Sequence, residues 1–233
     1  GENDLLVVDA GANRVVRLEL LTLRVTVQAG IRWFDLLRFL QPHGLSVRVM
    51  PAFANFTVGG SISSNQASPH LSSGPVAEGV TALTLVMADG IVRTVRPEID
   101  GDLFRAIVGG FGGFGVIVEA ELELTPNTPL LRRSHAMSAD LYPDFFRSRI
   151  QADAGARLHS AEFDAPGFER LRAVTWVETT DAPTHAQPLH YPGMVDPLRK
   201  VLDWSPPSRG FSRLYRRLVV EPLANARKTV HWL

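Results

Sequence analysis

Hydrophobic and polar positions alternate with two different periods near the start of the chain. Val25-Thr26-Val27-Gln28 alternates residue by residue, which is typical of a half-buried strand. From Trp33 to Leu40 the apolar residues recur at i, i+3, i+4 and i+7, which predicts an amphipathic helix. Leu45 to Val49 alternates again and predicts another strand. The two periods in one stretch predict an α+β fold.

The next part of the chain continues this mixture after a stretch rich in glycine and proline. Residues 51–79 are expected to form mostly loops. Val80–Met87 and Ile91–Val95 read as two strands joined by an Asp-Gly turn, a strong hairpin signal. Asp102–Val108 predicts a short helix, and Val116–Leu124 alternates as a long strand.

The composition changes at Thr125-Pro126-Asn127-Thr128-Pro129, where two prolines in five residues indicate a domain boundary. We expect a first domain over residues 1–126 and a second over 127–233. In the second, the pattern predicts a helix over Ala139–Ile150 and a strand over Leu171–Glu178. A further helix face, Phe211 to Leu218, follows a proline-rich stretch.

Composition excludes several classes of protein. The 233 residues are 45% hydrophobic, carry no net formal charge and include no cysteine. This balance excludes a disordered chain, a disulfide scaffold and binding by broad neutralisation of phosphates, so we expect no nucleic-acid partner. No apolar run reaches membrane-spanning length and no signal peptide is visible. We therefore expect a cytoplasmic protein without membrane association through this segment.

The first candidate for chemistry is the stretch Thr57-Val58-Gly59-Gly60-Ser61-Ile62-Ser63-Ser64-Asn65. Adjacent glycines let the backbone approach a ligand closely, and their amides can form an anion-binding concavity. Ser61, Ser63 and Asn65 add polar groups at alternate positions. The pattern suits a diphosphate or a polar ring system. A polar turn between two strands explains the same residues.

The second candidate is the loop Gly109-Gly110-Phe111-Gly112-Gly113-Phe114-Gly115. Its glycines match G-x-G-x-x-G literally, but a helix precedes the loop and a strand follows. A dinucleotide fingerprint needs the opposite order, so we reject the classical NAD interpretation. Two readings remain open: a backbone surface against a planar ligand, or a tight helix-to-strand turn.

Other catalytic schemes lack their motifs. Gly59-Gly60-Ser61-Ile62-Ser63 ends in serine, so it is no nucleophile elbow. No phosphate-binding P-loop occurs, and the seven histidines show no compact metal-ligand spacing. We therefore expect no metal site and disfavour acyl or phosphoryl transfer.

The order of these segments carries a resemblance to a known family. Six segments follow one another in the order found in the PCMH-type FAD-binding domain. They are Val25–Gly30, His43-Gly44-Leu45, Thr57–Ser61, Leu85–Gly90, Asp102-Leu103-Phe104 and Gly113–Ala120. Residues 1–126 thus resemble the FAD-binding domain of the vanillyl-alcohol oxidase / p-cresol methylhydroxylase family of FAD-linked oxidoreductases. Residues 127–233 resemble the start of its substrate or cap domain. Within them, Arg172–Glu178 is similar to sugar-, alditol- or lactone-oxidase-like members.

The resemblance implies a mixed or antiparallel sheet with flanking helices, FAD as cofactor and a separate substrate domain. The implied cofactor-binding residues are Thr57, Val58, Gly59, Gly60, Ser61, Ser63, Asn65, Gly115, Ile117 and Val118. The first seven would line the pyrophosphate and flavin side, and the last three would offer backbone groups. None is an acid or base, so the protein would bind and orient the flavin, which accepts the hydride.

Two departures from the family pattern qualify this expectation. The family's N-terminal pyrophosphate loop, often followed by a histidine bonded covalently to the flavin, has no counterpart in the chain. Many relatives carry a His-Gly pair after the position of Asn65, where this chain has Gln66-Ala67-Ser68-Pro69-His70. We therefore expect an incomplete FAD domain and cap domain, weak or no FAD binding by the 233 residues alone, and catalytic residues elsewhere.

The function that the resemblance implies is oxidation of a hydroxyl group on a small polar substrate, such as a sugar, alditol or lactone. Hydride would pass from the substrate to the flavin. The alternative is a non-catalytic protein that uses the same scaffold to bind a nucleotide or a partner.

Overall fold

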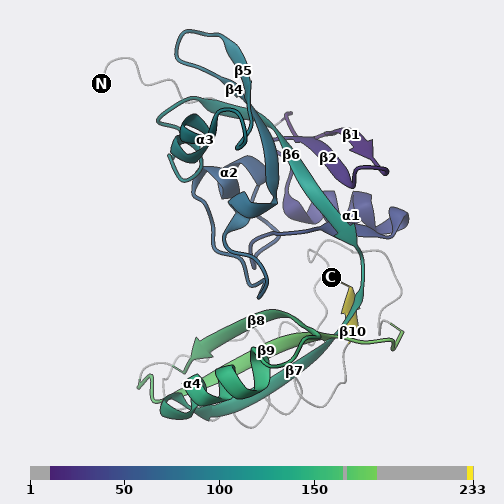
Figure 1. The fold of residues 1–233 in the computed structure, drawn as a ribbon, viewed down its shortest axis with the longest axis vertical. Helices are drawn as coiled ribbons and strands as arrows, with labels where there is room; N and C mark the ends of the chain where they lie inside the picture. Colours follow the sequence, from purple (N-terminus) through teal and green to yellow (C-terminus); the bar gives the residue numbers. More distant parts are fainter. Residues whose placement is uncertain (1–10, 165–166, 183–229, 233) are drawn as a thin grey trace, which may run out of the picture. The chain divides into compact units, whose positions relative to one another are not determined.

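The computed structural model describes residues 11–164, 167–182 and 230–232. The chain divides into two compact units, Gly1–Asn127 and Thr128–Leu233, which are called the first and second unit below. Each unit is built around its own antiparallel sheet (Figure 1).

The sheet of the first unit has the strand order β1-β2-β6-β4-β5, and β3 pairs with the far end of β6. All its strand pairs are antiparallel. The long strand β6 runs through the centre and pairs with β2, β3 and β4. The strands are β1 (Val15–Glu19), β2 (Arg24–Gln28), β3 (Leu45–Val47), β4 (Val80–Val86), β5 (Val92–Val95) and β6 (Val116–Pro126).

Three helices share one hydrophobic core with the inner residues of this sheet (Figure 1). They are α1 (Trp33–Leu40), α2 (Val58–Ser63) and α3 (Gly101–Ile107). On α1 the residues Trp33, Leu36 and Leu40 are fully buried, so the periodic face predicted from sequence is the packed face. The strands and helices predicted up to residue 124 are confirmed, apart from shifts at their ends.

The expectation that residues 51–79 are mostly loops is confirmed for most of the segment. The interpretation of the glycine stretch within them as a polar turn between two strands is wrong. The stretch contains α2, which begins where the Thr57 side chain accepts a hydrogen bond from the amide of Gly60. A capping threonine and two apolar residues four positions apart, Val58 and Ile62, are enough to anchor this short helix in the core.

The outer face of the sheet is held by one carboxylate. Glu121, in the centre of β6, is 7% exposed. Its Oε1 accepts hydrogen bonds from Thr81 Oγ1 at 2.7 Å, Arg96 Nη1 at 3.1 Å and Arg24 Nη1 at 3.2 Å. Arg17 lies 3.6 Å from the other carboxylate oxygen. Since these partners come from or follow four different strands, Glu121 links the sheet across its width.

The second unit has the strand order β10-β7-β9-β8, again antiparallel. The strands are β7 (Pro129–Ser138), β8 (Ala156–Phe163), β9 (Arg170–Glu178) and β10 (Val230–Trp232). The helix predicted over 139–150 is present as three consecutive segments: a 3-10 turn (Ala139–Leu141), α4 (Tyr142–Phe145) and a π-helical turn (Phe146–Ile150). The predicted strand 171–178 is confirmed in β9. The helix face predicted over Phe211–Leu218 lies outside the described residues.

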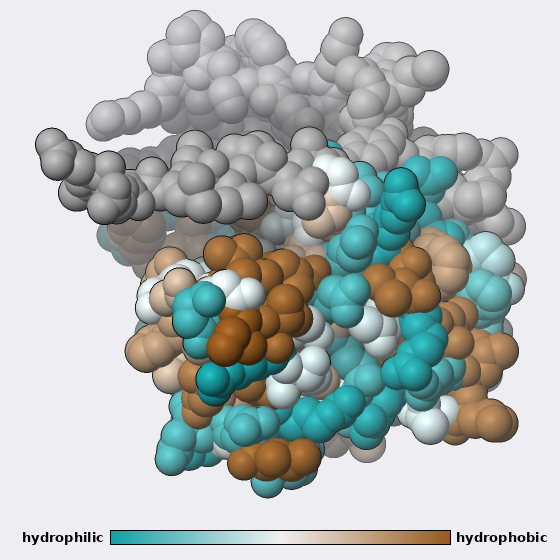
Figure 2. Space-filling model, turned by 90° about the horizontal axis from the view of Figure 1, so that it is seen from above, coloured by the Kyte–Doolittle hydropathy of each residue, from teal (hydrophilic) through white to brown (hydrophobic). Residues whose placement is uncertain are grey.

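Several large hydrophobic residues stay exposed on the first unit. Ile91, Val92 and Val116 lie around the β4–β5 end of the sheet, and Phe111 and Phe114 lie in the glycine loop. In Figure 2, which views the molecule from above, hydrophobic residues gather in separate patches between hydrophilic ones. Within the described residues, no helix is both long enough and apolar enough to span a membrane.

Candidate functional site

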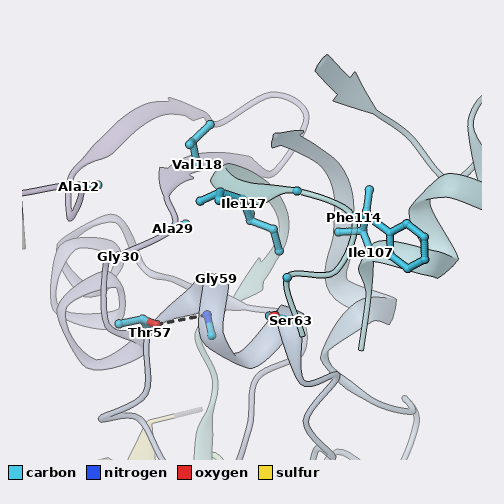
Figure 3. Close-up of a pocket in the computed structure, with 14 residues that line it drawn as sticks. Ala12, Ala29, Gly30, Thr57, Gly59, Ser63, Ile107, Phe114, Ile117 and Val118 are labelled. Carbon is cyan, nitrogen blue, oxygen red and sulfur yellow. Dashed lines mark hydrogen bonds between the residues drawn. The ribbon is translucent and has the colours of Figure 1, made fainter. Parts of the chain in front are cut away.

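The two glycine-rich stretches come together around one open cavity in the first unit. Its volume is about 370 Å³, within the ~300–1,000 Å³ typical of small-molecule sites. Figure 3 shows Thr57, Gly59 and Ser63 on one side, Ile117 and Val118 on the other, and Phe114 with Ile107 at one end. Sequence segments more than forty positions apart therefore form one site.

The structure brings most of the predicted site residues to this cavity. The predicted residues in its wall are Thr57, Gly59, Gly60, Ser63, Gly115, Ile117 and Val118. Three others stand behind it. Val58 is fully buried in the core, and Ser61 is equally buried, where its Oγ accepts a hydrogen bond from Trp33 Nε1 at 2.8 Å. Asn65 is also absent from the wall and has a positive φ of 43°.

The amides at the start of α2 are already used within the protein. Val58 N donates to Ile31 O and Gly59 N donates to Ala29 O, both at 2.8 Å. Gly60 N donates to Thr57 Oγ1 at 3.2 Å (dashed line in Figure 3). The expectation that these amides form an anion-binding concavity is therefore wrong in this structure, because each has an internal acceptor.

The glycines of α2 serve close packing instead. A Cβ atom on Gly59 would lie 2.6 Å from the Cβ of Ala29 and 3.1 Å from its carbonyl oxygen. A Cβ atom on Gly60 would lie 2.9 Å from Thr57 Oγ1. Because both positions lack side chains, α2 reaches the end of β2 and its backbone forms the floor of the cavity. A flat or extended ligand can lie directly on this surface.

The glycine loop that follows α3 forms the opposite rim. Gly112 and Gly115 adopt φ of 81° and 145°, which residues with side chains rarely adopt. A Cβ atom on Gly115 would lie 2.9 Å from Val86 O. These two glycines let the chain turn from α3 into β6 while Phe114 stays at the cavity. The interpretation of this loop as a tight helix-to-strand turn is confirmed, and its residues Gly112, Phe114 and Gly115 also line the cavity.

The start of β6 presents backbone to the cavity. β2 pairs with β6 only over Glu119–Glu123, and the last bond on this side joins Ala29 N to Val118 O at 2.9 Å. In the described part of the chain, Val116 and Ile117 pair with β4 and have no strand partner on the side of β2. This half-free strand edge can hydrogen-bond a ligand, as expected for Ile117.

The ten residues named from the resemblance leave out half of the cavity wall. The wall also contains Gly112 and Phe114, from the second candidate loop, and Ala12, Ala29, Gly30, Ile107 and Val116. Most of these are small or apolar residues whose type gives no chemical signal. The position of Ala29-Gly30, directly after β2 and opposite the first glycine motif, becomes evident only when α2 packs against it.

None of the described residues that line the cavity has a titratable side chain. His70, the histidine nearest in sequence to α2, is not part of the wall. Burial, with a smaller contribution from the charge of Arg48, lowers the pKa of His70 to about 4, so it is neutral at pH 7. No group of three or more metal-ligating side chains occurs among the described residues. The site is built to hold and orient a ligand through backbone and small side chains.

Comparison with protein families indicates which ligand this cavity binds. Residues 1–96 match the model of the FAD binding domain. The cavity fits such a group, since its floor is free of side chains and its rim offers unpaired strand backbone. FAD is therefore the cofactor of the first unit.

Individual relatives agree with the family match. The chain is 40% identical over 124 residues to decaprenylphosphoryl-beta-D-ribose oxidase of Mycolicibacterium smegmatis, covering 52% of this chain and 27% of that protein. It is 37% identical over 122 residues to L-gulonolactone oxidase of Mus musculus, covering 52% and 28%. It is 33% identical over 141 residues to cytokinin dehydrogenase 10 of Oryza sativa subsp. japonica, covering 58% and 25%. The chain thus spans about a quarter of the length of these curated relatives.

A solved structure of an alkyldihydroxyacetonephosphate synthase shares the fold. It matches with a TM-score of 0.58 at 14% identity, over 72% of this chain and 37% of that chain. The predicted α+β class, an antiparallel sheet with flanking helices, is confirmed by this match and by the sheet itself. Residues 1–96 of the first unit are thus similar to FAD binding domains, and the matched relatives support the resemblance of the chain to the vanillyl-alcohol oxidase / p-cresol methylhydroxylase family of FAD-linked oxidoreductases.

Proposed function

We propose that the protein is an FAD-dependent oxidoreductase that oxidises a hydroxyl group of a small polar substrate, such as a sugar, alditol or lactone. The observation that carries the proposal is the cavity between α2 and β6, whose wall, among the described residues, offers backbone, two hydroxyl groups and apolar side chains but no carboxylate, imidazole or amine. Such a site supplies position rather than chemistry. When bound there, FAD supplies the chemistry by accepting a hydride from the substrate.

Each part of the cavity has a distinct task in this proposal. The glycine floor of α2 lets the cofactor approach the end of β2 within van der Waals contact. The free edge of β6 at Val116 and Ile117 hydrogen-bonds polar atoms of the cofactor. Phe114 and Ile107 form an apolar end of the cavity, against which an apolar part of the cofactor can pack. The ten residues named from the resemblance remain our proposal for the cofactor site. Seven of them line the cavity, and Val58, Ser61 and Asn65 lie behind its wall and support it.

The names of the relatives leave the substrate open. They include a ribose-derivative oxidase, lactone oxidases and cytokinin dehydrogenases. We favour a hydroxyl substrate because the segment Arg172–Glu178 is similar to sugar, alditol and lactone oxidases. In the structure this segment forms most of β9, the central strand of the second unit.

Anaerobic reduction of the bound flavin tests the proposal. The protein, loaded with FAD, is mixed with an alditol, an aldose or an aldonolactone, and the visible absorbance of the flavin is followed. We expect at least one of these to bleach the flavin, and a matched compound lacking the hydroxyl to leave it unchanged. Bleaching by an amine alone would contradict the choice of substrate. Flavin that binds but is reduced by none of these compounds would favour a nucleotide-binding protein without catalysis.

A further inference from the structure

The second unit contains a larger cavity that the FAD site does not explain. Its volume is about 800 Å³, and residues of β7, β9, the helical segment 142–150 and the loop 152–154 line it. Every lining residue belongs to the second unit. This cavity is therefore distinct from the FAD site.

The wall of this cavity carries an excess of positive charge. Arg133, on β7, lies with Nη1 3.6 Å from Asp153 Oδ2, which is a loose ion pair. Arg149, in the π-helical turn, lines the same cavity and forms no ion pair with any described residue. Two arginines and a single carboxylate thus line the cavity. Guanidinium groups bind carboxylate and phosphate through paired hydrogen bonds, so the excess favours an anionic ligand.

The helical turn that carries Arg149 is unusual in its hydrogen bonding. Gln151 N donates to Phe146 O at 2.9 Å, five residues back, so this is a π-helical turn. Such turns are rare and occur frequently at functional sites. Here the turn places Ser148 and Arg149 in the cavity wall together with the buried Ile150.

One part of the wall is apolar. Ile150 and Val177 are 5% and 7% exposed, and Phe145 lies beside His135 with ring centroids 5.1 Å apart. All four residues line the cavity. These groups can cover the apolar or aromatic body of a ligand whose charged end meets the guanidinium groups.

A buried hydroxyl completes the wall. Thr175, in the centre of β9, lines the cavity and is 2% exposed. Its Oγ1 lies 2.9 Å from His159 Nδ1, and His159 Nε2 lies 2.9 Å from the hydroxyl of Tyr142. This chain of hydrogen bonds fixes the threonine side chain and ties α4 to the sheet. Because a hydroxyl can make three hydrogen bonds, Thr175 keeps capacity for a ligand.

From these contacts we propose that the cavity is a binding site for a small molecule with an apolar or aromatic body and one anionic group, a carboxylate or a phosphate. The guanidinium groups of Arg149 and Arg133 hold the anion. Phe145, Ile150 and Val177 cover the body. Thr175 orients a polar atom of the ligand at the base of the site.

Calorimetric titration of the protein with phenyl phosphate at low ionic strength tests the proposal. We expect saturable binding at one site per chain. Arg149→Gln removes the unpaired guanidinium, and we expect it to weaken binding by about tenfold, the effect of losing a hydrogen bond between charged groups. The matched control is Arg147→Gln, two positions away on the same helical segment, where Arg147 pairs with Asp144 at 2.6 Å and does not line the cavity. This control should bind as the wild type does.

Further arms separate the charged end from the body and identify the anion. Ala154 is exposed and lines the cavity, so Ala154→Leu should keep the fold while occupying space and weakening phenyl phosphate binding. Benzoate in place of phenyl phosphate tells a carboxylate site from a phosphate site, and binding of either supports the proposal. Equal affinity for inorganic phosphate and phenyl phosphate would overturn it, as would unchanged binding in folded Arg149→Gln or no binding of either aromatic anion.

Discussion

Replacing Gly59 by alanine is expected to weaken FAD binding by about 5- to 150-fold, since overpacking of a tight contact costs about 1–3 kcal/mol. The added Cβ would lie 2.6 Å from Ala29 Cβ and 3.1 Å from Ala29 O. Relief of this contact requires α2 to move away from β2, which breaks the bond from Gly59 N to Ala29 O. The floor of the cavity moves with it. Titration of FAD followed by quenching of its fluorescence measures the affinity.

The direction of the stability change makes the Gly59 variant informative. Alanine in a helix is favoured over glycine by about 0.5–1 kcal/mol, so without the clash the substitution would stabilise α2. Gly101→Ala is the matched control. It also lies in a helix, α3, but its Cβ would meet only the flexible end of Arg105, at 3.2 Å. A Gly59→Ala protein with wild-type stability and FAD affinity would show that α2 does not depend on this contact.

Replacing Glu121 by glutamine is expected to destabilise the first unit by about 2 kcal/mol, near the value for hydrogen bonds to a charged group. The carboxylate is buried and accepts bonds from Thr81, Arg24 and Arg96. Since the arginines are partly exposed, the loss stays below the ~3–5 kcal/mol of a fully buried ion pair. Urea unfolding followed by Trp33, the core tryptophan of the first unit, measures it.

The pH dependence of this effect has a definite sign. Burial alone would raise the pKa of Glu121, but hydrogen bonds from Thr81 and Arg96 and the charges of Arg96 and Arg24 outweigh burial and lower it. A carboxyl group with a lowered pKa in the folded state stabilises the fold at pH values above its unfolded pKa. The advantage of wild type over Glu121→Gln should therefore be full at neutral pH. It should shrink as the pH falls through the folded pKa.

A control separates Glu121 from surface charges. Asp102 is fully exposed and pairs with Arg105 within the same helix. Asp102→Asn should leave the urea midpoint almost unchanged, because exposed ion pairs contribute little. If Glu121→Gln shifts the midpoint no more than Asp102→Asn does, the account of Glu121 as the link across the sheet is wrong.

Periodic patterns predicted those elements that bury one face. α1 follows from the spacing of Trp33, Leu36 and Leu40, all of which are buried. β6 follows from its alternation, because Ala120 and Leu122 face the core while Glu121 faces outward. In both elements, the apolar residues that define the sequence pattern are the residues that pack in the core.

Elements stabilised mainly by tertiary contacts were missed. β7 and β8 pair along β9, but Arg132-Arg133 breaks the apolar pattern of β7, and in β8 the alternation of Ala156 to His159 covers only four residues before Ser160 ends it. α2 was missed because its two glycines disfavour a helix, and only Thr57 before it signals a helix start.

Only the two glycine-rich stretches of the cofactor site were predictable from the sequence. Both glycine stretches were found, and both reach the cavity. The physical reason differs from the expected one at α2, where the amides of Val58 and Gly59 bond to Ile31 and Ala29. Adjacent glycines in a sequence indicate that the backbone closely approaches another group. Only the structure shows whether that group is a ligand or a neighbouring strand.

Hydrogen–deuterium exchange with and without saturating FAD tests the central claim most directly, that the cavity between α2 and β6 holds the cofactor. We expect FAD to slow exchange in peptides covering residues 57–63 and 112–118. Peptides covering β7, β8 and the cavity of the second unit should exchange as before. Slowed exchange confined to other segments, with residues 57–63 and 112–118 unchanged at full FAD occupancy, would contradict the account.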